Sequence, residues 1–334
     1  MSKTKSLNWL FIIFCVVLFT IPLWVVNPLI LNILIYTFLF AFYVGSWNII
    51  GKYAGQISVG HAAYFGLGAY ISVWLSIYYG ISPWFGMFVG GVTAAFLAFL
   101  IGLVSFRLAG LFYIFATLGF AEVVRIAFLH PLKGLSGGEE GIPFSLGRTS
   151  LYHFQFVERW PYYFIALVMM LIVILILQKI ENSKLGYYLL AIREDQEAAE
   201  SIGIDIFKYK LIAASMSGFL SALAGTFYVH FLGYIGVTDV FGIMVSIQPI
   251  IISWIGGAGA FGPVVGSFIL TPTIMYLVLM LGGAARGLHT FIYAVILIVI
   301  VMFLPEGITG PLYRKVYRPL RERLETLEQR TTNI

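Results

Sequence analysis

Residues 55–70 read GQISVGHAAYFGLGAY and join two segments that are long and apolar enough to cross a bilayer. Glycines and small residues, together with Gln56, Ser58 and His61, stand where helices that face lipid carry leucine and isoleucine. Backbone this rich in glycine is costly at membrane depth unless protein packs around it or it lines a polar cavity. This signature stretch therefore predicts a membrane protein with an internal path rather than a simple anchor.

The composition of the whole chain supports bulk insertion in a bilayer. Of the 334 residues, 60% are hydrophobic and only 10% are charged, whereas a soluble domain has about 25% charged residues. The net charge is +5, and no basic run is interleaved with aromatic residues outside the apolar segments, so nucleic acid is not an expected partner. Cys15 is the only cysteine, which excludes a disulfide or a cysteine metal site within the chain.

Ten segments reach the roughly 20 mostly apolar residues that a spanning helix needs. They cover residues 8–26, 29–50, 60–79, 84–105, 110–129, 160–180, 209–232, 240–257, 261–281 and 287–304. The first is longer than a signal-peptide core and no small-x-small cleavage site follows it, so we expect a retained helix. The eighth and tenth are short, and either could be broken or re-entrant. The chain is predicted to be an all-α polytopic membrane protein with about ten transmembrane helices.

Lysines and arginines orient these spans, because short cytoplasmic loops carry an excess of both. Lys3 and Lys5 place the N-terminus in the cytoplasm, and the basic residues of 314–323 place the C-terminus there as well. The loop at 130–159 then falls outside, as a flexible connection or a docking surface for an external partner. The loop at 181–208 falls inside.

Two groups of four spans lie in residues 29–129 and 209–304, and they enter the membrane from opposite sides. This is the geometry of two inverted repeats, a common plan of transporters with the pathway at the repeat interface. We assign residues 1–310 to one transmembrane domain and residues 311–334 to a cytoplasmic C-terminal tail, whose basic, helix-prone stretch could form a helix at the membrane surface.

The inside loop holds the second informative segment, because residues 189–203 predict one short amphipathic helix. Arg193 and Glu197 would pair one turn apart, and Gly203 would end the helix in the left-handed conformation. The apolar face would carry Ile192, Ala199 and Ile202. Such a helix at the membrane surface suits docking into the groove of a partner, and the alternative is a solvated helix without a partner.

Glu122 and Arg125 lie three residues apart within the fifth span, where ionisable groups are rare and usually paired or turned toward a polar interior. We favour a structural ion pair near the helix end over a substrate contact. His61 is interpreted as a hydrogen-bonded structural residue, since no second histidine, cysteine or carboxylate stands at metal-ligand spacing. Gln56 and Ser58 could line the path or cap helices.

Close helix packing is the expected role of Gly66 and Gly68. No phosphate-binding loop, catalytic triad, zinc-protease signature or dinucleotide fingerprint is present in the sequence. The chain is therefore predicted to be a transport subunit that is not an enzyme and holds no cofactor, so that any ATP would be bound by partner subunits.

The motifs together resemble bacterial ABC importer permeases for branched-chain amino acids, most closely the second of their two permease subunits (LivM type). The resemblance runs in order from about residue 45 to 310. It is carried by the signature stretch, by GGEEGIP at 137–143, by AIRED at 191–195, by LAG at 223–225 and by GG at 256–257 with GPVVG at 262–266.

This resemblance implies a multi-pass protein of the bacterial cytoplasmic (inner) membrane. It also implies a heterodimer with a sister permease, two cytoplasmic ATPase subunits and an external substrate-binding protein. The predicted helix 189–203 would be the coupling helix on an ATPase. The expected coupling residues are Arg193, Glu194, Glu197, Ala198, Glu200 and Gly203. The expected residues of the translocation path or signature are Gln56, Ser58, Gly60, His61, Gly66, Gly68, Gly256 and Gly257.

Two other interpretations stay open on the sequence. A permease of the same family could carry urea, amides or another amino acid, because the binding protein does much of the selection. An ion-coupled secondary transporter would carry acidic groups deep in several spans, and only Glu122 fits that pattern.

Overall fold

A computed structural model describes residues 17–22, 24, 27–108, 110–144, 149–257 and 259–281. The long helices in this part of the chain are α2 (Pro28–Asn48), α3 (His61–Tyr79), α4 (Pro83–Ser105), α5 (Leu111–Leu129), α7 (Trp160–Glu181), α10 (Ile206–Leu232), α12 (Ile243–Gly256) and α13 (Gly262–Leu281). The shorter elements are the π-helix η1 (Ile49–Tyr53), α6 (Lys133–Ser136), β1 (Ile142–Pro143), α8 (Lys184–Glu194), α9 (Gln196–Ser201), β2 (Tyr234–Ile235) and α11 (Val237–Phe241).

The second to ninth predicted spans each correspond to one of the long helices. Within the described residues, seven helices are long and apolar enough to cross a membrane: Pro28–Tyr53, Pro83–Ser105, Leu111–Leu129, Trp160–Glu181, Ile206–Leu232, Val237–Gly256 and Gly262–Met280. Helix α3 is not among them, because its glycines, serines and tyrosines make it more polar. The prediction of an all-α polytopic membrane protein is confirmed.

Three predicted features lie wholly or mostly outside the described residues. They are the first span at 8–26, the tenth at 287–304 and the tail at 311–334. The short eighth span, which the sequence left open as broken or re-entrant, is broken: α11 and α12 are separated by Gly242, whose backbone is extended.

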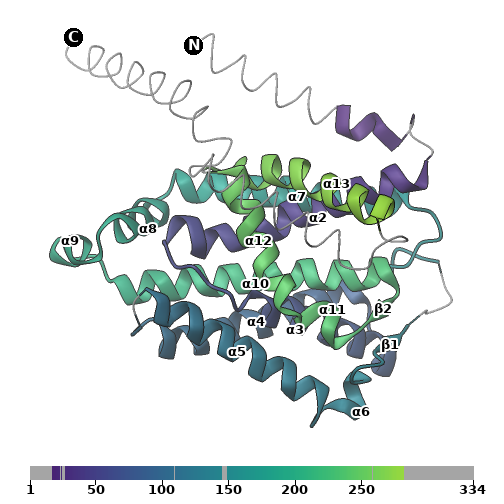
Figure 1. Cartoon of the computed structure of the whole chain (residues 1–334), viewed down its shortest axis with the longest axis horizontal. Helices are drawn as coiled ribbons and strands as arrows, with labels where there is room; N and C mark the ends of the chain where they lie inside the picture. Colours follow the sequence, from purple (N-terminus) through teal and green to yellow (C-terminus); the bar gives the residue numbers. More distant parts are fainter. Residues whose placement is uncertain are drawn as a thin grey trace.

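Helix α10 lies at the centre of the helix packing, with α2 on one side and α3 and α4 on the other (Figure 1). Helices α7 and α13 pack on α2, while α5 lies along the edge beside α3, α4 and α11. The signature stretch therefore sits in the middle of the bundle, since it leads from the end of α2 into α3.

Glycines let α3, α4 and α10 approach closely. A Cβ atom on Gly68 would lie 2.2 Å from the carbonyl oxygen of Ala222, and one on Gly225 would lie 1.9 Å from that of Phe65. Gly66 faces the ring of Phe241, with 2.2 Å between its added Cβ and the nearest ring atom. The predicted packing role of Gly66 and Gly68 is confirmed.

The loop predicted to lie outside is held to the bundle rather than loosely attached. Strand β1 pairs with β2 in antiparallel register, with Ile142 opposite Ile235. The indole Nε1 of Trp74 donates to the Leu135 carbonyl at 2.8 Å, and the hydroxyl of Tyr234 donates to the Glu140 carbonyl at 3.0 Å. The described part of this loop is therefore bonded to α3 and to the segment after α10.

The inside loop differs from its prediction, because one helix over 189–203 is replaced by α8 and α9. Asp195 divides them with an extended backbone (φ −156°), and its carboxylate accepts a hydrogen bond from the Ala198 amide at 3.0 Å. An aspartate stabilises a helix start better than a helix interior, since its oxygen caps free amides. Gly203 adopts the left-handed conformation expected of it after α9 (φ +86°).

Replacing Gly225 by alanine should destabilise the protein by at least about 1–3 kcal/mol, because the added methyl group meets the Phe65 carbonyl and forces α3 and α10 apart. The measurement is thermal unfolding of the purified protein in detergent. Gly119→Ala is the matched control, since no atom lies within 4 Å of the added Cβ on α5. An equal melting temperature for the two variants would contradict the close packing.

Candidate functional site

The signature stretch begins just after the π-helix η1, which continues α2 as far as Tyr53. Gly55 has a left-handed backbone (φ +68°), and the chain then runs without regular structure to Gly60 before α3 starts at His61. The Gln56 amide donates to the Ile50 carbonyl at 3.0 Å, which closes the turn. Non-helical backbone thus lies between two buried helices, as the glycine pattern predicted.

His61 is held by hydroxyl groups from two directions. Its Nδ1 lies 3.2 Å from Ser58 Oγ, and its Nε2 lies 2.7 Å from Ser217 Oγ on α10. The Ser217 hydroxyl donates its only hydrogen to the Ser46 carbonyl at 2.7 Å, so it must accept from His61 Nε2. His61 Nε2 therefore carries a hydrogen, and Nδ1 shares a second hydrogen bond with the Ser58 hydroxyl.

The backbone of the signature stretch is bonded by side chains from three further helices. Trp47 Nε1 of α2 donates to the Ser58 carbonyl at 2.9 Å. The amide of Val59 donates to Thr117 Oγ1 of α5 at 3.1 Å, and the amide of Ala62 donates to Ser246 Oγ of α12 at 2.9 Å. These bonds make the stretch a junction of α2, α5, α10 and α12.

The structure places the predicted path residues of this stretch in the protein interior. Ser58 and His61 are 2% and 1% exposed, and Gln56 is 8% exposed. A Cβ atom on Gly60 would lie 2.7 Å from the Thr117 carbonyl oxygen, so this glycine permits contact with α5. The structural interpretation of His61 is confirmed, and the role of these residues along a path stays a prediction.

Gly256 and Gly257 form the tight connection from α12 to α13. A Cβ atom on Gly256 would lie 1.9 Å from the carbonyl oxygen of Gly262, and Gly257 has φ +84°. Glu181, which the sequence analysis did not single out, lies between the two glycine-rich breaks. It accepts from the Tyr53 hydroxyl at 2.8 Å and from the backbone of Ala260.

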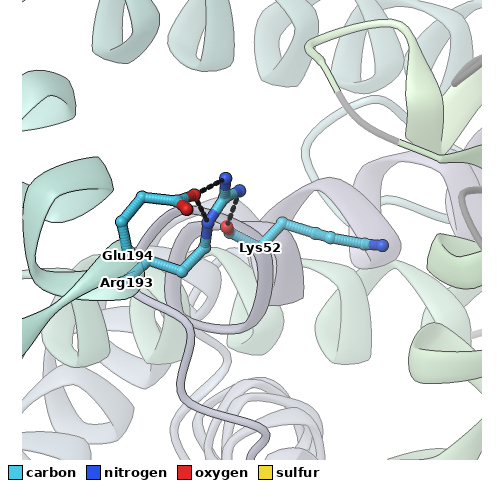
Figure 2. Close-up of polar contacts among 3 residues, drawn as sticks. All are labelled: Lys52, Arg193 and Glu194. Atoms are coloured by element: carbon cyan, nitrogen blue, oxygen red, sulfur yellow. Dashed lines mark hydrogen bonds and ion pairs between the residues drawn. The ribbon is translucent and has the colours of Figure 1, made fainter.

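Arg193 joins α8 to the start of the signature stretch (Figure 2). Its Nη1 donates to the Lys52 carbonyl at 3.1 Å, and its side chain lies so close to Gly55 that an added Cβ would be 2.6 Å from Arg193 Cγ. The predicted ion pair with Glu197 is wrong, because the helix break at 195 turns Glu197 away. Arg193 pairs with the adjacent Glu194 instead.

A small apolar core fixes α8 and α9 to the bundle. It consists of Ile192, Ala199 and Ile204, whereas Ile202 is 74% exposed, so its predicted place on this face is wrong. The turn at Gly203 brings Ile204 back to the core in its place. Lys210 of α10 is only 4% exposed and donates from Nζ to Gln196 Oε1 of α9 at 2.9 Å. All six predicted coupling residues are exposed: Arg193, Glu194, Glu197, Ala198, Glu200 and Gly203.

Glu122 and Arg125 form the ion pair that their spacing predicts on α5. Arg125 Nε donates to Glu122 Oε2 at 2.9 Å, and Arg125 Nη2 bonds Glu122 Oε1. The side chains are 45% and 28% exposed, respectively. The pair therefore lies apart from the buried junction around His61.

A multi-pass helical bundle with a glycine-rich, hydrogen-bonded break at its centre defines a membrane permease of the transporter class. The chain belongs to the family described as the branched-chain amino acid transport system permease component, whose family model matches residues 29–302. The match covers every long helix of the described structure.

Two curated relatives share this family character. The chain is 27% identical over 267 residues to the high-affinity branched-chain amino acid transport system permease protein LivM of Escherichia coli (strain K12). It is 26% identical over 267 residues to the protein of the same name from Salmonella typhimurium. Each alignment covers 71% of this chain and 62% of the relative, so the chain spans less than two thirds of their length. No solved structure matches the chain.

Substituting Ser217 by alanine should destabilise the protein by about 1–3 kcal/mol, because the buried His61 Nε2 and the Ser46 carbonyl both lose a partner. Thermal unfolding of the purified protein measures the loss. Thr93→Ala is the control, since its hydroxyl makes only an exposed bond within α4 and its removal should cost less than about 0.5 kcal/mol. Similar losses for both variants would argue against the junction.

Proposed function

We propose that the chain is the membrane-spanning permease subunit of an ABC importer in the bacterial cytoplasmic membrane, and that it forms part of the translocation path for leucine, isoleucine and valine. The family match over residues 29–302 supports this function. The partners in this proposal are a sister permease, two cytoplasmic ATPase subunits that bind ATP, and an external substrate-binding protein. The permease itself makes and breaks no covalent bond.

The contact of Arg193 with the Lys52 carbonyl carries the mechanistic part of the proposal (Figure 2). Helices α8 and α9 present exposed polar side chains on one side and are fixed to the bundle on the other. A segment with these two sides suits a partner that binds at the surface of the bundle and moves its helices from there. We therefore assign ATPase docking to the pair α8–α9 in place of a single coupling helix.

Two contacts transmit motion of α8–α9 in this mechanism. Arg193 acts on the end of η1 and on Gly55, and therefore on the stretch that leads to His61. Gln196 of α9 acts on α10 through its bond to Lys210, and Ser217 of α10 bonds His61. ATP binding by the partner subunits would move α8–α9, and both contacts would displace the same central junction. Alternating access to the path follows from that displacement.

Reconstitution tests the function directly. The chain would be co-expressed with the products of its neighbouring genes, purified, and assayed in proteoliposomes for ATP-dependent uptake of labelled leucine with the binding protein present. Uptake that requires ATP is the expected result. Stable assembly with an ATPase but no leucine uptake would shift the substrate to urea, amides or another amino acid. Failure to associate with any ATPase would overturn the importer assignment.

Arg193→Ala should lower leucine uptake at least about tenfold while ATP hydrolysis and subunit assembly persist, because the bond to the Lys52 carbonyl no longer passes motion to the signature stretch. Gly55→Ala should do the same, since its Cβ displaces the Arg193 side chain and its φ is positive. Lys184→Ala, an exposed change at the start of α8, is the control. Uptake at the control rate in both variants would refute this coupling route.

A further inference from the structure

The ion pair on α5 lies on the least enclosed spanning helix. Only 22% of the α5 span is buried within this chain, the lowest share among the seven spanning helices. Glu122 lies seven residues before the helix end at Leu129, about 10 Å along the axis at 1.5 Å per residue. The two charges thus stand within membrane depth, with 45% of the Glu122 side chain and 28% of the Arg125 side chain uncovered by the chain itself.

Charges exposed to hydrocarbon are expensive, so ionisable residues in spans face protein or a water-filled cavity. The pair uses Nε and Nη2 of Arg125 with the two oxygens of Glu122, which leaves further arginine hydrogens and carboxylate lone pairs open to a ligand. This side of α5 therefore borders a polar space or another protein, rather than lipid tails.

Apolar side chains flank the pair on the same side of the helix. Ile126 lies one turn after Glu122 and is 45% exposed, and Phe115 lies two turns before it and is 65% exposed. An anion, a cation and an apolar wall match the three parts of an aliphatic amino acid. They correspond to its ammonium group, its carboxylate and its branched side chain.

We propose that Glu122 and Arg125 contact the amino acid during its passage, with Glu122 accepting from the ammonium group and Arg125 donating to the carboxylate. This inference rests on the proposed function and names a contact for its substrate. Between transport events Glu122 and Arg125 bond each other, and during transport each would bond the substrate instead. Neither charge is therefore left without a partner. A contact that exchanges in this way is weak enough to release the substrate, as transport requires.

The same helix is connected to the proposed coupling route. Thr117, five residues before Glu122, accepts from the Val59 amide of the signature stretch at 3.1 Å. A displacement of that stretch therefore reaches α5 about one and a half turns before Glu122. The exposure of Glu122, Arg125 and the flanking Phe115 and Ile126 would therefore change when the central junction moves.

Thiol accessibility tests whether the position borders water. In a Cys15→Ser background, Glu122→Cys should be labelled by the water-soluble reagent methanethiosulfonate ethylsulfonate in proteoliposomes of the complete complex, as measured by the mass increase of the chain. Phe96→Cys is the control, because Phe96 is an apolar residue of the spanning helix α4 that is 60% exposed, and it should stay unlabelled. Equal absence of labelling at both positions would overturn the proposal.

Transport kinetics test the chemical role. The neutral double variant Glu122→Gln with Arg125→Gln retains a hydrogen-bonding pair, so a merely structural role predicts uptake close to that of the wild type. A substrate contact predicts at least a tenfold loss of leucine uptake with assembly, melting temperature and basal ATP hydrolysis unchanged. Val123→Thr, on the neighbouring side of α5, is the control. Wild-type complex without ATP-dependent uptake would instead contradict the proposed function itself.

Discussion

The rest of the structure depends on one constraint: non-helical backbone at membrane depth must have its hydrogen bonds satisfied by protein. Between Gly55 and Gly60 the chain leaves the helix ladder, and its polar groups are met by side chains of α2 and α5, while Ser246 of α12 bonds the Ala62 amide in the first turn of α3. The arrangement of the bundle follows from this requirement. Helix α10 must approach α3 closely enough for Ser217 to reach His61, and the glycines at 68 and 225 make that approach sterically possible.

The junction also explains how a surface segment can act on a buried one. Arg193 contacts the entrance of the signature stretch, and Glu181 joins the Tyr53 hydroxyl to the second glycine-rich break. Both contacts come from the same end of the bundle as α8 and α9. In the proposed importer, a displacement of α8 and α9 reaches both glycine-rich breaks through these hydrogen bonds. Helix α5 moves with them, because Thr117 bonds the Val59 amide.

Sequence patterns predicted the spans well, because hydropathy and glycine spacing act locally along the chain. They failed where a local choice had two outcomes: Asp195 could continue a helix or cap a new one, and the capping bond prevailed. They also could not find Ser217 as the partner of His61, since 156 residues separate the two. Glu181 escaped notice for the same reason, because its partners are set by the packing of α7 and not by any nearby motif.

The segment that leads into this junction, η1, is a π-helix that could convert to an α-helix. A π-turn holds one residue more than an α-turn, and such turns occur frequently at functional sites. Rewinding Ile49–Tyr53 into α geometry would rotate everything after it by about 100° and release about 1.5 Å of chain. The Lys52 carbonyl that Arg193 holds lies inside this turn. Arg193 therefore bonds η1 at a residue that would move if the turn changed from π to α geometry, and the change would lengthen or shorten the connection from η1 to α3.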